Sequence, residues 1–300
     1  MQEEFPVEIK KVGVVGCGLM GSGIAHVAAQ AGYDVVVREA DDALLDQGLG
    51  RIRKFLDGGV KKGKLEAPEA DAIFGRIRGT TKLDALADRD IVIEAVTENL
   101  QVKEEVFTAL DAVTAGHAIL ASNTSSLSIV EMAAFTGRAD RFLGLHFFNP
   151  VPLMKLVEVV RTVRASPETV ETGMAFARSL KKEPILAKDS PGFVVNLLLV
   201  PYLLGAIRAL EKGIASAPDI DKGMVLGCGY PMGPLTLLDF VGLDTTYYIA
   251  EIMFDEFKSP EYAAPTLLKR MVAAGYHGKK SGRGFYDYAT DPPAPTEGLV

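Results

Sequence analysis

Two ionisable side chains interrupt stretches of sequence that are otherwise apolar. His146 lies in LGLHFF (143–148) and Glu158 in KLVEVV (155–160), on either side of the turn NPVP. Burying such groups without partners costs about 1–3 kcal/mol for a neutral group and more for a charge, so they either point to solvent or face each other across a site. A carboxylate that accepts from one imidazole nitrogen fixes its tautomer and raises its basicity. The two residues therefore predict a general base, His146, and its orienting partner, Glu158.

Two further polar positions suggest groups that hold a substrate oxygen. Ser125 lies in SNTSS (122–126), just beyond an expected strand end, which is where ligands bind in open parallel sheets. Asn196 interrupts the apolar stretch FVVNLLLV and needs a hydrogen-bond partner, for which a substrate oxygen is one option. Each of these polar residues, taken singly, also fits a structural role in a core or a cap. Together, beside a nucleotide-binding loop, they describe a base, its orienting partner and two positioning groups.

That loop is GCGLMG (16–21), which fits the pattern G-x-G-x-x-G between an expected strand and an expected helix. Gly16 makes the tight turn, Gly18 lets the backbone approach a pyrophosphate, and Gly21 lets the helix pack closely on the strand. Leu19 and Met20 complete the loop. The helix N-terminus adds free N–H groups and the positive end of its dipole. The segment predicts a dinucleotide site.

An acidic residue at the end of the second expected strand bears on the choice of dinucleotide. Glu39 follows Gly21 at the distance where an acid accepts hydrogen bonds from the adenosine ribose and repels a 2′-phosphate. This favours NAD as the cofactor. Arg38 stands beside it and could pair with a 2′-phosphate, which leaves NADP as an alternative.

Strands and helices alternate along the first part of the chain. The expected strands lie at 11–15, 33–37, 90–96, 117–122, 141–148 and 155–160, and helical periodicity covers 22–32, 41–78 and 102–113. Such alternation predicts an α/β Rossmann-type domain with a largely parallel sheet. The break DSPGF (189–193) is followed by helical periodicity to about residue 275. We expect a dinucleotide-binding domain over 1–188 and an all-α domain over 189–300.

Composition limits the class of protein. The 300 residues include 32 basic and 39 acidic side chains, a net charge of −7 that argues against nucleic acid as the main partner. Cys17 and Cys228 are the two cysteines, which suggests a reducing compartment without a disulfide framework. The start of the chain lacks a signal-peptide pattern, and the longest apolar run is too short to span a bilayer. We expect a cytoplasmic protein with no membrane partner and no metal.

Over nearly its whole length the chain resembles the L-3-hydroxyacyl-CoA dehydrogenase family. It is most similar to the bacterial short-chain members, which act on 3-hydroxybutyryl-CoA. The matching stretches follow the family's order: GCGLMGSGIA, EAVTENLQVKEEVF, ASNTSSLSI, GLHFFNPVPLMKLVEVV, KDSPGFVVNLLLVPYL, GYPMGPLTLLDFVGLDT and GKKSGRGFYDY. The resemblance implies an NAD-dependent oxidoreductase of fatty acid and butanoate metabolism that interconverts 3-hydroxyacyl-CoA and 3-oxoacyl-CoA, and it implies a homodimer formed through the helical domain.

The resemblance also implies roles for individual residues. His146 is similar to the family's general base and Glu158 to its orienting partner, while Ser125 and Asn196 resemble the residues that complete the site. The positions that match cofactor-contacting residues are Gly16, Gly18, Leu19, Met20, Gly21, Glu39, Glu98, Lys103, Ser125 and Asn149, with either Lys279 or Lys280 from the C-terminal domain. Two positions depart from the family pattern: Leu197 replaces an arginine, and Glu39 replaces an aspartate.

A basic helical segment resembles the region of the family that meets the phosphates of CoA. Its candidate residues are Arg51, Arg53, Lys54 and Lys61. The alternative is a solvated helix face without a ligand.

Three other interpretations stay open. One is a dehydrogenase of free hydroxy acids of the gulonate type, and another is a 6-phosphogluconate-type enzyme, whose catalytic-lysine motif is not evident here. The third is an NAD-binding protein without catalysis. HFFNPVPLMKLVE and the basic segment favour a CoA substrate, and the intact polar residues of the site favour an active enzyme.

Overall fold

The computed structural model describes residues 8–299. The chain forms two compact units that divide between Phe193 and Val194, later than the boundary predicted at 188/189. The reason is local packing. Asp189 accepts hydrogen bonds from the backbone N–H groups of Ile129 and Val130, and Phe193 is buried in a core of the first unit. The residues that follow the last strand of the first unit therefore still belong to it.

One sheet organises the first unit. Its strand order is β3-β2-β1-β4-β5-β6-β7-β8, and every neighbouring pair is parallel except β6 with β7. The strands are β1 (Lys11–Val15), β2 (Asp34–Arg38), β3 (Ile77–Thr80), β4 (Ile91–Glu94), β5 (Ile119–Ser122), β6 (Phe142–Phe147), β7 (Leu156–Arg161) and β8 (Glu183–Lys188). The predicted Rossmann-type architecture is confirmed.

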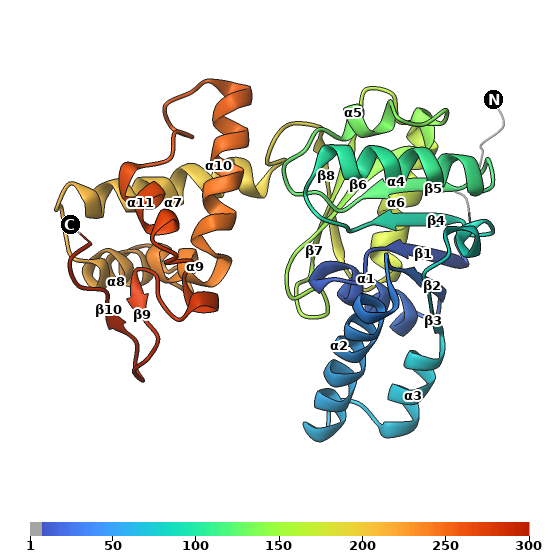
Figure 1. Cartoon of the computed structure of the whole chain (residues 1–300), viewed down its shortest axis with the longest axis horizontal. Helices are drawn as coiled ribbons and strands as arrows, with labels where there is room; N and C mark the ends of the chain where they lie inside the picture. The colour runs from blue at the N-terminus through green and yellow to red at the C-terminus, as the bar shows by residue number, and fades with distance from the viewer. Residues whose placement is uncertain (1–7, 300) are drawn as a thin grey trace. The chain divides into compact units, whose positions relative to one another are not determined.

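Helices cover both faces of this sheet. They are α1 (Leu19–Gln30), α2 (Asp42–Lys61), α3 (Ala67–Gly75), α4 (Leu100–Val113), α5 (Ile129–Ala133) and α6 (Pro167–Ser179). Because strand side chains alternate, Val12 and Val14 join the core under α1, whereas Val15 joins the core under α4 and α5. Figure 1 shows α1 on one side of the sheet and α4 and α5 on the other.

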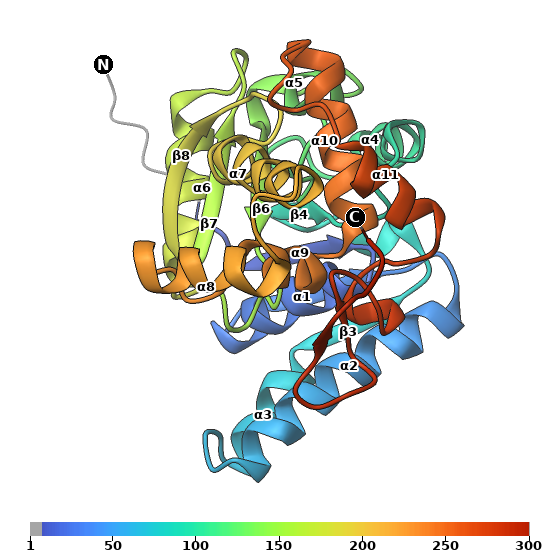
Figure 2. The same cartoon turned by 90° about the vertical axis from the view of Figure 1, so that its left-hand side faces the viewer.

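The segment expected to be helical over 41–78 ends in a strand. Helices α2 and α3 lie side by side and extend beyond the sheet in both views (Figures 1 and 2). After them, residues 77–80 form β3, so the helical prediction for 77–78 is wrong. This four-residue edge strand is too short to show a period of its own, and only its pairing with β2 defines it. The expectations also lacked β8 and α6.

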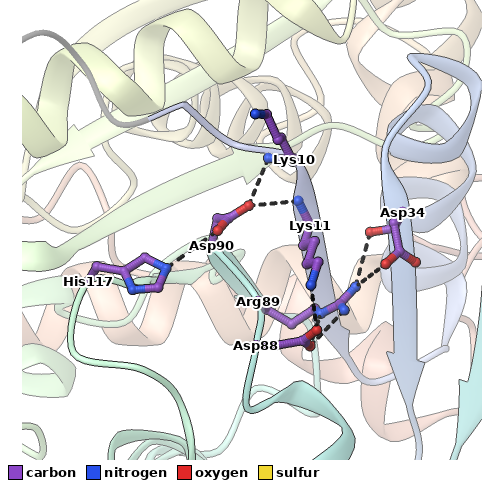
Figure 3. Close-up of polar contacts among 7 residues, drawn as sticks. All are labelled: Lys10, Lys11, Asp34, Asp88, Arg89, Asp90 and His117. Carbon is purple, nitrogen blue, oxygen red and sulfur yellow. Dashed lines mark hydrogen bonds and ion pairs between the residues drawn. The ribbon is translucent and has the colours of Figure 1, made fainter.

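A cluster of charged residues joins the amino-terminal ends of β1, β2 and β4 (Figure 3). Arg89 is 2% exposed, and its guanidinium donates to Asp34 at 3.0 Å and to Asp88 at 2.6 Å. Asp90 accepts from the backbone N–H groups of Lys10 and Lys11, each at 2.8 Å. These contacts hold the sheet at the edge opposite to the glycine loop, because the loop follows the carboxyl end of β1.

The second unit is helical, as predicted. Its helices are α7 (Val195–Glu211), α8 (Ala217–Cys228), α9 (Pro234–Val241), α10 (Leu243–Phe257) and α11 (Thr266–Ala273). A hairpin of two-residue strands, β9 (Tyr286–Asp287) and β10 (Ala294–Pro295), adds to the predicted all-α pattern. The buried carboxylate of Asp239 accepts from the backbone N–H groups of Phe285 and Tyr286, each at 2.9 Å, which fixes this hairpin on α9.

The described helices can be compared in length and composition with a helix that spans a membrane. Over residues 8–299 no helix combines the length and the apolar composition that spanning a bilayer requires.

Candidate active site

The antiparallel pair of β6 and β7 brings the two ionisable residues of the apolar stretches together. His146 lies directly opposite Glu158 in the strand register, and His146 Nδ1 lies 2.6 Å from Glu158 Oε2. Glu158 is 0% exposed and His146 is 6% exposed. Directly opposed residues of an antiparallel pair point to the same face of the sheet, so the register by itself makes the contact possible. The predicted contact between the two side chains is present.

This contact favours one tautomer of the neutral imidazole. A carboxylate is only an acceptor, so Nδ1 donates to Glu158, and in the neutral ring Nε2 carries the lone pair. The rings of Phe148 and Phe193 lie 4.5 Å and 5.6 Å from the imidazole, measured between centroids, and further limit its movement. The result is a nearly buried imidazole of fixed tautomer whose Nε2 is suited to accept a proton.

The loop after β5 lies beside β6. Asn123 Oδ1 accepts from the backbone N–H of Phe147 at 2.9 Å, which ties the loop SNTSS to the strand that carries His146. Ser125 is partly exposed in this loop, and its backbone N–H donates to Glu98 Oε1 at 3.0 Å. The structure therefore places Ser125 in a loop that is attached to the histidine strand.

A buried ionic network supports the same loop. Lys103, 1% exposed, lies 2.6 Å from Glu94 Oε1 and 3.3 Å from Glu98 Oε2. Burial opposes the charged form of Glu98, but the charge of Lys103 and the hydrogen bonds from Thr124 and Ser125 outweigh it and hold the pKa of Glu98 below its usual value. Glu98 and Lys103 form an ion pair in the structure, and their expected place beside the cofactor stays a prediction.

The glycine loop has the geometry that a dinucleotide requires. Gly16 has φ +92°, and a Cβ there would lie 2.6 Å from the carbonyl oxygen of Ala95. A Cβ on Gly21 would lie 1.8 Å from the carbonyl oxygen of Gly16. At Gly18, by contrast, an added Cβ has no neighbour within 4 Å among the described residues. Two glycines therefore serve the turn and the packing, and the third leaves space where a pyrophosphate approaches.

Glu39 faces this loop from the end of β2. Its Oε1 accepts from the backbone N–H of Cys17 at 2.6 Å, and its Oε2 accepts from that of Ala40 at 2.8 Å. The carboxylate is thus held at the loop, where an acid is suited to bind ribose hydroxyls. The side chain of Arg38 is partly buried, and among the described residues its Nε has no hydrogen-bond partner. The loop and Glu39 fit an NAD molecule.

A pocket of about 650 Å³ lies between α1, α2 and the turn that joins β6 to β7. Asn149 and Leu153 line it from the turn, and Leu19 and His26 line it from α1. The turn is held by Lys182, whose Nζ donates to the carbonyl oxygens of Val151 and Met154 at 2.5 Å and 2.8 Å. Asn149 is therefore placed at this pocket.

The basic residues of α2 divide into two groups. Arg51 and Lys54 line the pocket, and Arg51 also donates to the carbonyl oxygen of Cys17 at 3.2 Å. Arg53 instead forms ion pairs with Asp57 at 3.0 Å and Asp71 at 2.6 Å, so it joins α2 to α3 as the alternative of a structural helix face implies. Lys61 is exposed outside the pocket lining.

Sequence reasoning missed two lysines of this pocket. Lys62 and Lys64 follow α2 and line the pocket. The run VKKGK in the printed sequence contained the signal, but only the end of the helix decides which of its lysines turn toward the pocket.

The remaining predicted residues lie in the second unit. Asn196 lies in the first turn of α7. Lys280 Nζ forms an ion pair with Asp244 at 2.6 Å, and Lys279 Nζ lies 4.4 Å from the centroid of the Phe240 ring. The roles of Asn196, Lys279 and Lys280 stay predictions.

A dinucleotide-binding sheet followed by a helical unit, with a histidine–glutamate pair, defines a class of nicotinamide-dependent dehydrogenases. The profile described as 3-hydroxyacyl-CoA dehydrogenase, NAD binding domain, matches residues 11–190, and that of the C-terminal domain matches residues 192–288. The chain belongs to the 3-hydroxyacyl-CoA dehydrogenase family. NAD(H) is accordingly its cofactor.

Individual relatives agree with this assignment. The 3-hydroxybutyryl-CoA dehydrogenase of Mycobacterium tuberculosis is 53% identical over 282 residues, which cover 93% of this chain and 99% of that protein. The mitochondrial hydroxyacyl-coenzyme A dehydrogenase of Homo sapiens is 47% identical over 287 residues, 93% of this chain and 91% of that protein. A crystal structure of (S)-3-hydroxybutyryl-CoA dehydrogenase PaaH1 from Ralstonia eutropha has a TM-score of 0.91 at 46% identity, covering 94% of this chain and all of that one.

His26 at the pocket makes stability depend on pH. Burial, with a contribution from the charge of Lys182, lowers its pKa from 6.5 to about 4. The unfolded chain takes up a proton near pH 6.5 that the folded protein takes up only near pH 4, so the free energy of unfolding falls as the pH drops through this interval. We expect His26→Gln to lose less stability than the parent between about pH 7 and about pH 4, measured by urea unfolding.

His117→Gln is the control for this measurement. The side chain of His117 is 54% exposed and contacts Asp90 outside the pocket, so this variant makes the same substitution without changing the packing around His26. Equal losses of stability on acidification in His26→Gln and in the parent would contradict the prediction.

Proposed function

We propose that the protein interconverts (S)-3-hydroxybutyryl-CoA and acetoacetyl-CoA, and 3-hydroxyacyl-CoA and 3-oxoacyl-CoA more generally, with NAD(H). The observation that carries the proposal is the contact of 2.6 Å between His146 and the fully buried Glu158. The names of the relatives support the same substrates.

His146 is the proposed acid and base. In oxidation, its Nε2 takes the proton of the 3-hydroxyl group while the hydride of C3 leaves, and in reduction the protonated ring returns that proton. Bound NAD supplies the hydride acceptor, and NADH supplies the donor. Glu158 stabilises the imidazolium that forms after proton uptake, because its carboxylate already accepts from Nδ1.

Other residues position the reactants in this proposal. Ser125 and Asn196 hold the 3-oxygen and the thioester end of the substrate, so that C3 faces the nicotinamide. Cofactor contacts are proposed for the glycine loop with Leu19 and Met20, for Glu39, and for Glu98, Lys103, Asn149 and Lys280. The attachment of the Ser125 loop to the histidine strand supports its part in this arrangement.

The pocket beside α2 is the proposed site for part of the CoA moiety. Arg51, Lys54, Lys62 and Lys64 contribute cationic groups to its lining, which suits the phosphates of CoA. Phe55 and Leu153 offer apolar contacts to the same ligand. Lys61 was predicted to contact the same phosphates, but it is exposed outside this lining, so the proposed CoA site does not include it.

NAD is the proposed preference over NADP. Glu39 accepts two backbone hydrogen bonds at the loop, and its negative charge beside the ribose repels a 2′-phosphate. Arg38 is the residue that opposes this preference, because its cationic side chain lies next to Glu39 in the sequence.

A reducing cytoplasmic setting is also proposed. Both cysteines are free thiols, Cys17 buried and Cys228 exposed. An exposed thiol persists more readily where glutathione and thioredoxin keep thiols reduced.

The first measurement follows the loss of NADH absorbance with acetoacetyl-CoA, then with a long-chain 3-oxoacyl-CoA, and repeats both with NADPH. We expect turnover of the four-carbon ester with NADH and weaker activity with NADPH. Turnover of free acetoacetate in place of the ester would contradict a CoA substrate, and NADH binding without any turnover would contradict an enzyme.

Removing the proposed base should abolish most of this activity. We expect His146→Ala to lower kcat by about 10²–10⁴-fold, because proton transfer then lacks its acid and base, while the Kd of NADH stays close to that of the parent. His117→Ala is the control, since His117 lies exposed at the opposite edge of the sheet. Near-normal turnover of His146→Ala would show that the base lies elsewhere.

Two lysines of the same helix test the CoA pocket. Lys54 lines the pocket and Lys61 does not, although both are exposed. We expect Lys54→Met to raise the KM of acetoacetyl-CoA about two- to fivefold, the scale of an exposed ion pair, and to leave the KM of the pantetheine ester unchanged. Lys61→Met should change neither KM. Equal effects of both substitutions would place the phosphates outside this pocket.

A homodimer formed through the helical unit is proposed. Leu198 is 70% exposed, Leu226 is 73% exposed and Phe240 is 51% exposed, all in helices of this unit. A dimer that covered these side chains would remove their apolar surface from water. We expect sedimentation at micromolar concentration to give the mass of two chains, and a single species of monomer mass would reject the dimer.

A further inference from the structure

Glu94 is a fully buried carboxylate for which the proposed mechanism gives no role. It is the last residue of β4, at the carboxyl edge of the sheet, and it is 0% exposed. Its Oε1 accepts from the backbone N–H of Val96 at 2.7 Å and from Lys103 Nζ at 2.6 Å. Its Oε2 accepts from Ser122 Oγ at 2.6 Å. Three donors from three segments thus converge on one carboxylate.

These donors lead to the loop that carries Ser125. Lys103 connects Glu94 to Glu98, because its Nζ lies 3.3 Å from Glu98 Oε2. The other carboxylate oxygen of Glu98 accepts from the Thr124 hydroxyl, from the backbone N–H of Ser125 at 3.0 Å and from Ser126 Oγ at 3.4 Å. A continuous path of charge-assisted contacts therefore runs from Glu94 to the backbone of Ser125.

The distances indicate which carboxylate anchors Lys103. The contact with Glu94 is 2.6 Å and fully buried, whereas the contact with Glu98 is 3.3 Å and involves a side chain that is 26% exposed. A buried ammonium needs a close partner, and removing one member of such a pair leaves an uncompensated charge. Glu94 therefore sets the position of Lys103, and Lys103 in turn holds the carboxylate that binds the Ser125 loop.

We propose that Glu94 is a positioning residue of the reaction, which acts through Lys103 and Glu98 to fix the backbone of Ser125 beside the substrate oxygen. The proposal rests on the proposed function, since it assigns Ser125 to the substrate. Glu94 itself touches neither substrate nor reacting atoms in this arrangement. Its effect is on geometry, and small displacements of positioning groups lower turnover strongly.

The test is Glu94→Gln, which keeps the size of the side chain and removes its charge. We expect kcat with acetoacetyl-CoA to fall about tenfold or more. The Kd of NADH should rise by a smaller factor, because Lys103 and Glu98, which Glu94 positions, are also proposed cofactor contacts. Amide hydrogen exchange should become faster in residues 123–127 and stay unchanged in β1 and β2. Glu105→Gln, on the exposed side of the helix α4 that carries Lys103, is the control and should change none of these quantities.

A double variant tests whether Glu94 acts through Glu98. If it does, the double variant Glu94→Gln with Glu98→Gln loses less kcat than the product of the two single losses, because both substitutions interrupt the shared path through Lys103. If the two single losses of kcat multiply in the double variant, Glu94 does not act through Glu98. If Glu94→Gln has normal kcat and normal hydrogen exchange in residues 123–127, the whole proposal is wrong.

The test remains decisive if the variant does not fold or if the parent has no activity. If Glu94→Gln does not fold, Glu94→Gln with Lys103→Met removes both buried charges together, and it should show the same faster exchange in residues 123–127. If the parent has no activity with acetoacetyl-CoA, the proposed function fails, and hydrogen exchange still decides whether Glu94 fixes the loop.

Discussion

The antiparallel pairing of β6 with β7 is the interaction on which the candidate site depends. All other neighbouring strands of the sheet are parallel, and parallel neighbours need long crossover connections. A short turn between β6 and β7 instead places His146 directly opposite Glu158. The carboxylate is fully buried, so its charge is tolerated only with a close donor, and the imidazole supplies that donor. Strand pairing and electrostatics therefore specify the same arrangement.

The polar groups of the first unit fall into two sets at opposite edges of the sheet. At the amino-terminal edge, Arg89 joins Asp34 and Asp88, whose carboxylates stay largely exposed. At the carboxyl edge, Glu94 and Glu158 are completely buried, and they contact Lys103 and His146, respectively. Exposed carboxylates add modest stability, whereas buried ones impose geometry because their donors cannot be replaced by water. The proposed reaction uses the edge at which geometry is imposed.

The sequence alone was sufficient for the features that repeat a local pattern. The glycine loop follows from spacing and from its place between a strand and a helix, and the strands that carry His146 and Glu158 follow from their apolar stretches. The edge strand β3 could not be found in this way, because four residues show no period and their pairing with β2 is a tertiary contact.

Residues whose role depends on distant partners were also missed. Glu94 ends an ordinary apolar strand, and its partner Ser122 lies 28 residues away in the sequence. The basic residues of α2 show the same limit of prediction from sequence. Arg53 and Lys54 are adjacent, but Lys54 lines the pocket and Arg53 pairs with Asp71. Composition identified the charged segment, and the three-dimensional packing decides what each charge does.

The turn between β6 and β7 has a consequence for how this fold can diversify. The distance between His146 and Glu158 is set by strand register, so a shift of one residue within either strand would turn one side chain to the other face of the sheet. Val151 of the turn is buried in the core, but Asn149 and Leu153 line the pocket, and Lys182 holds the turn through backbone carbonyls that any side chain would leave in place. In the proposed function, ligand preference is thus free to evolve in the turn while the proposed proton-transfer pair stays fixed in the strands beside it.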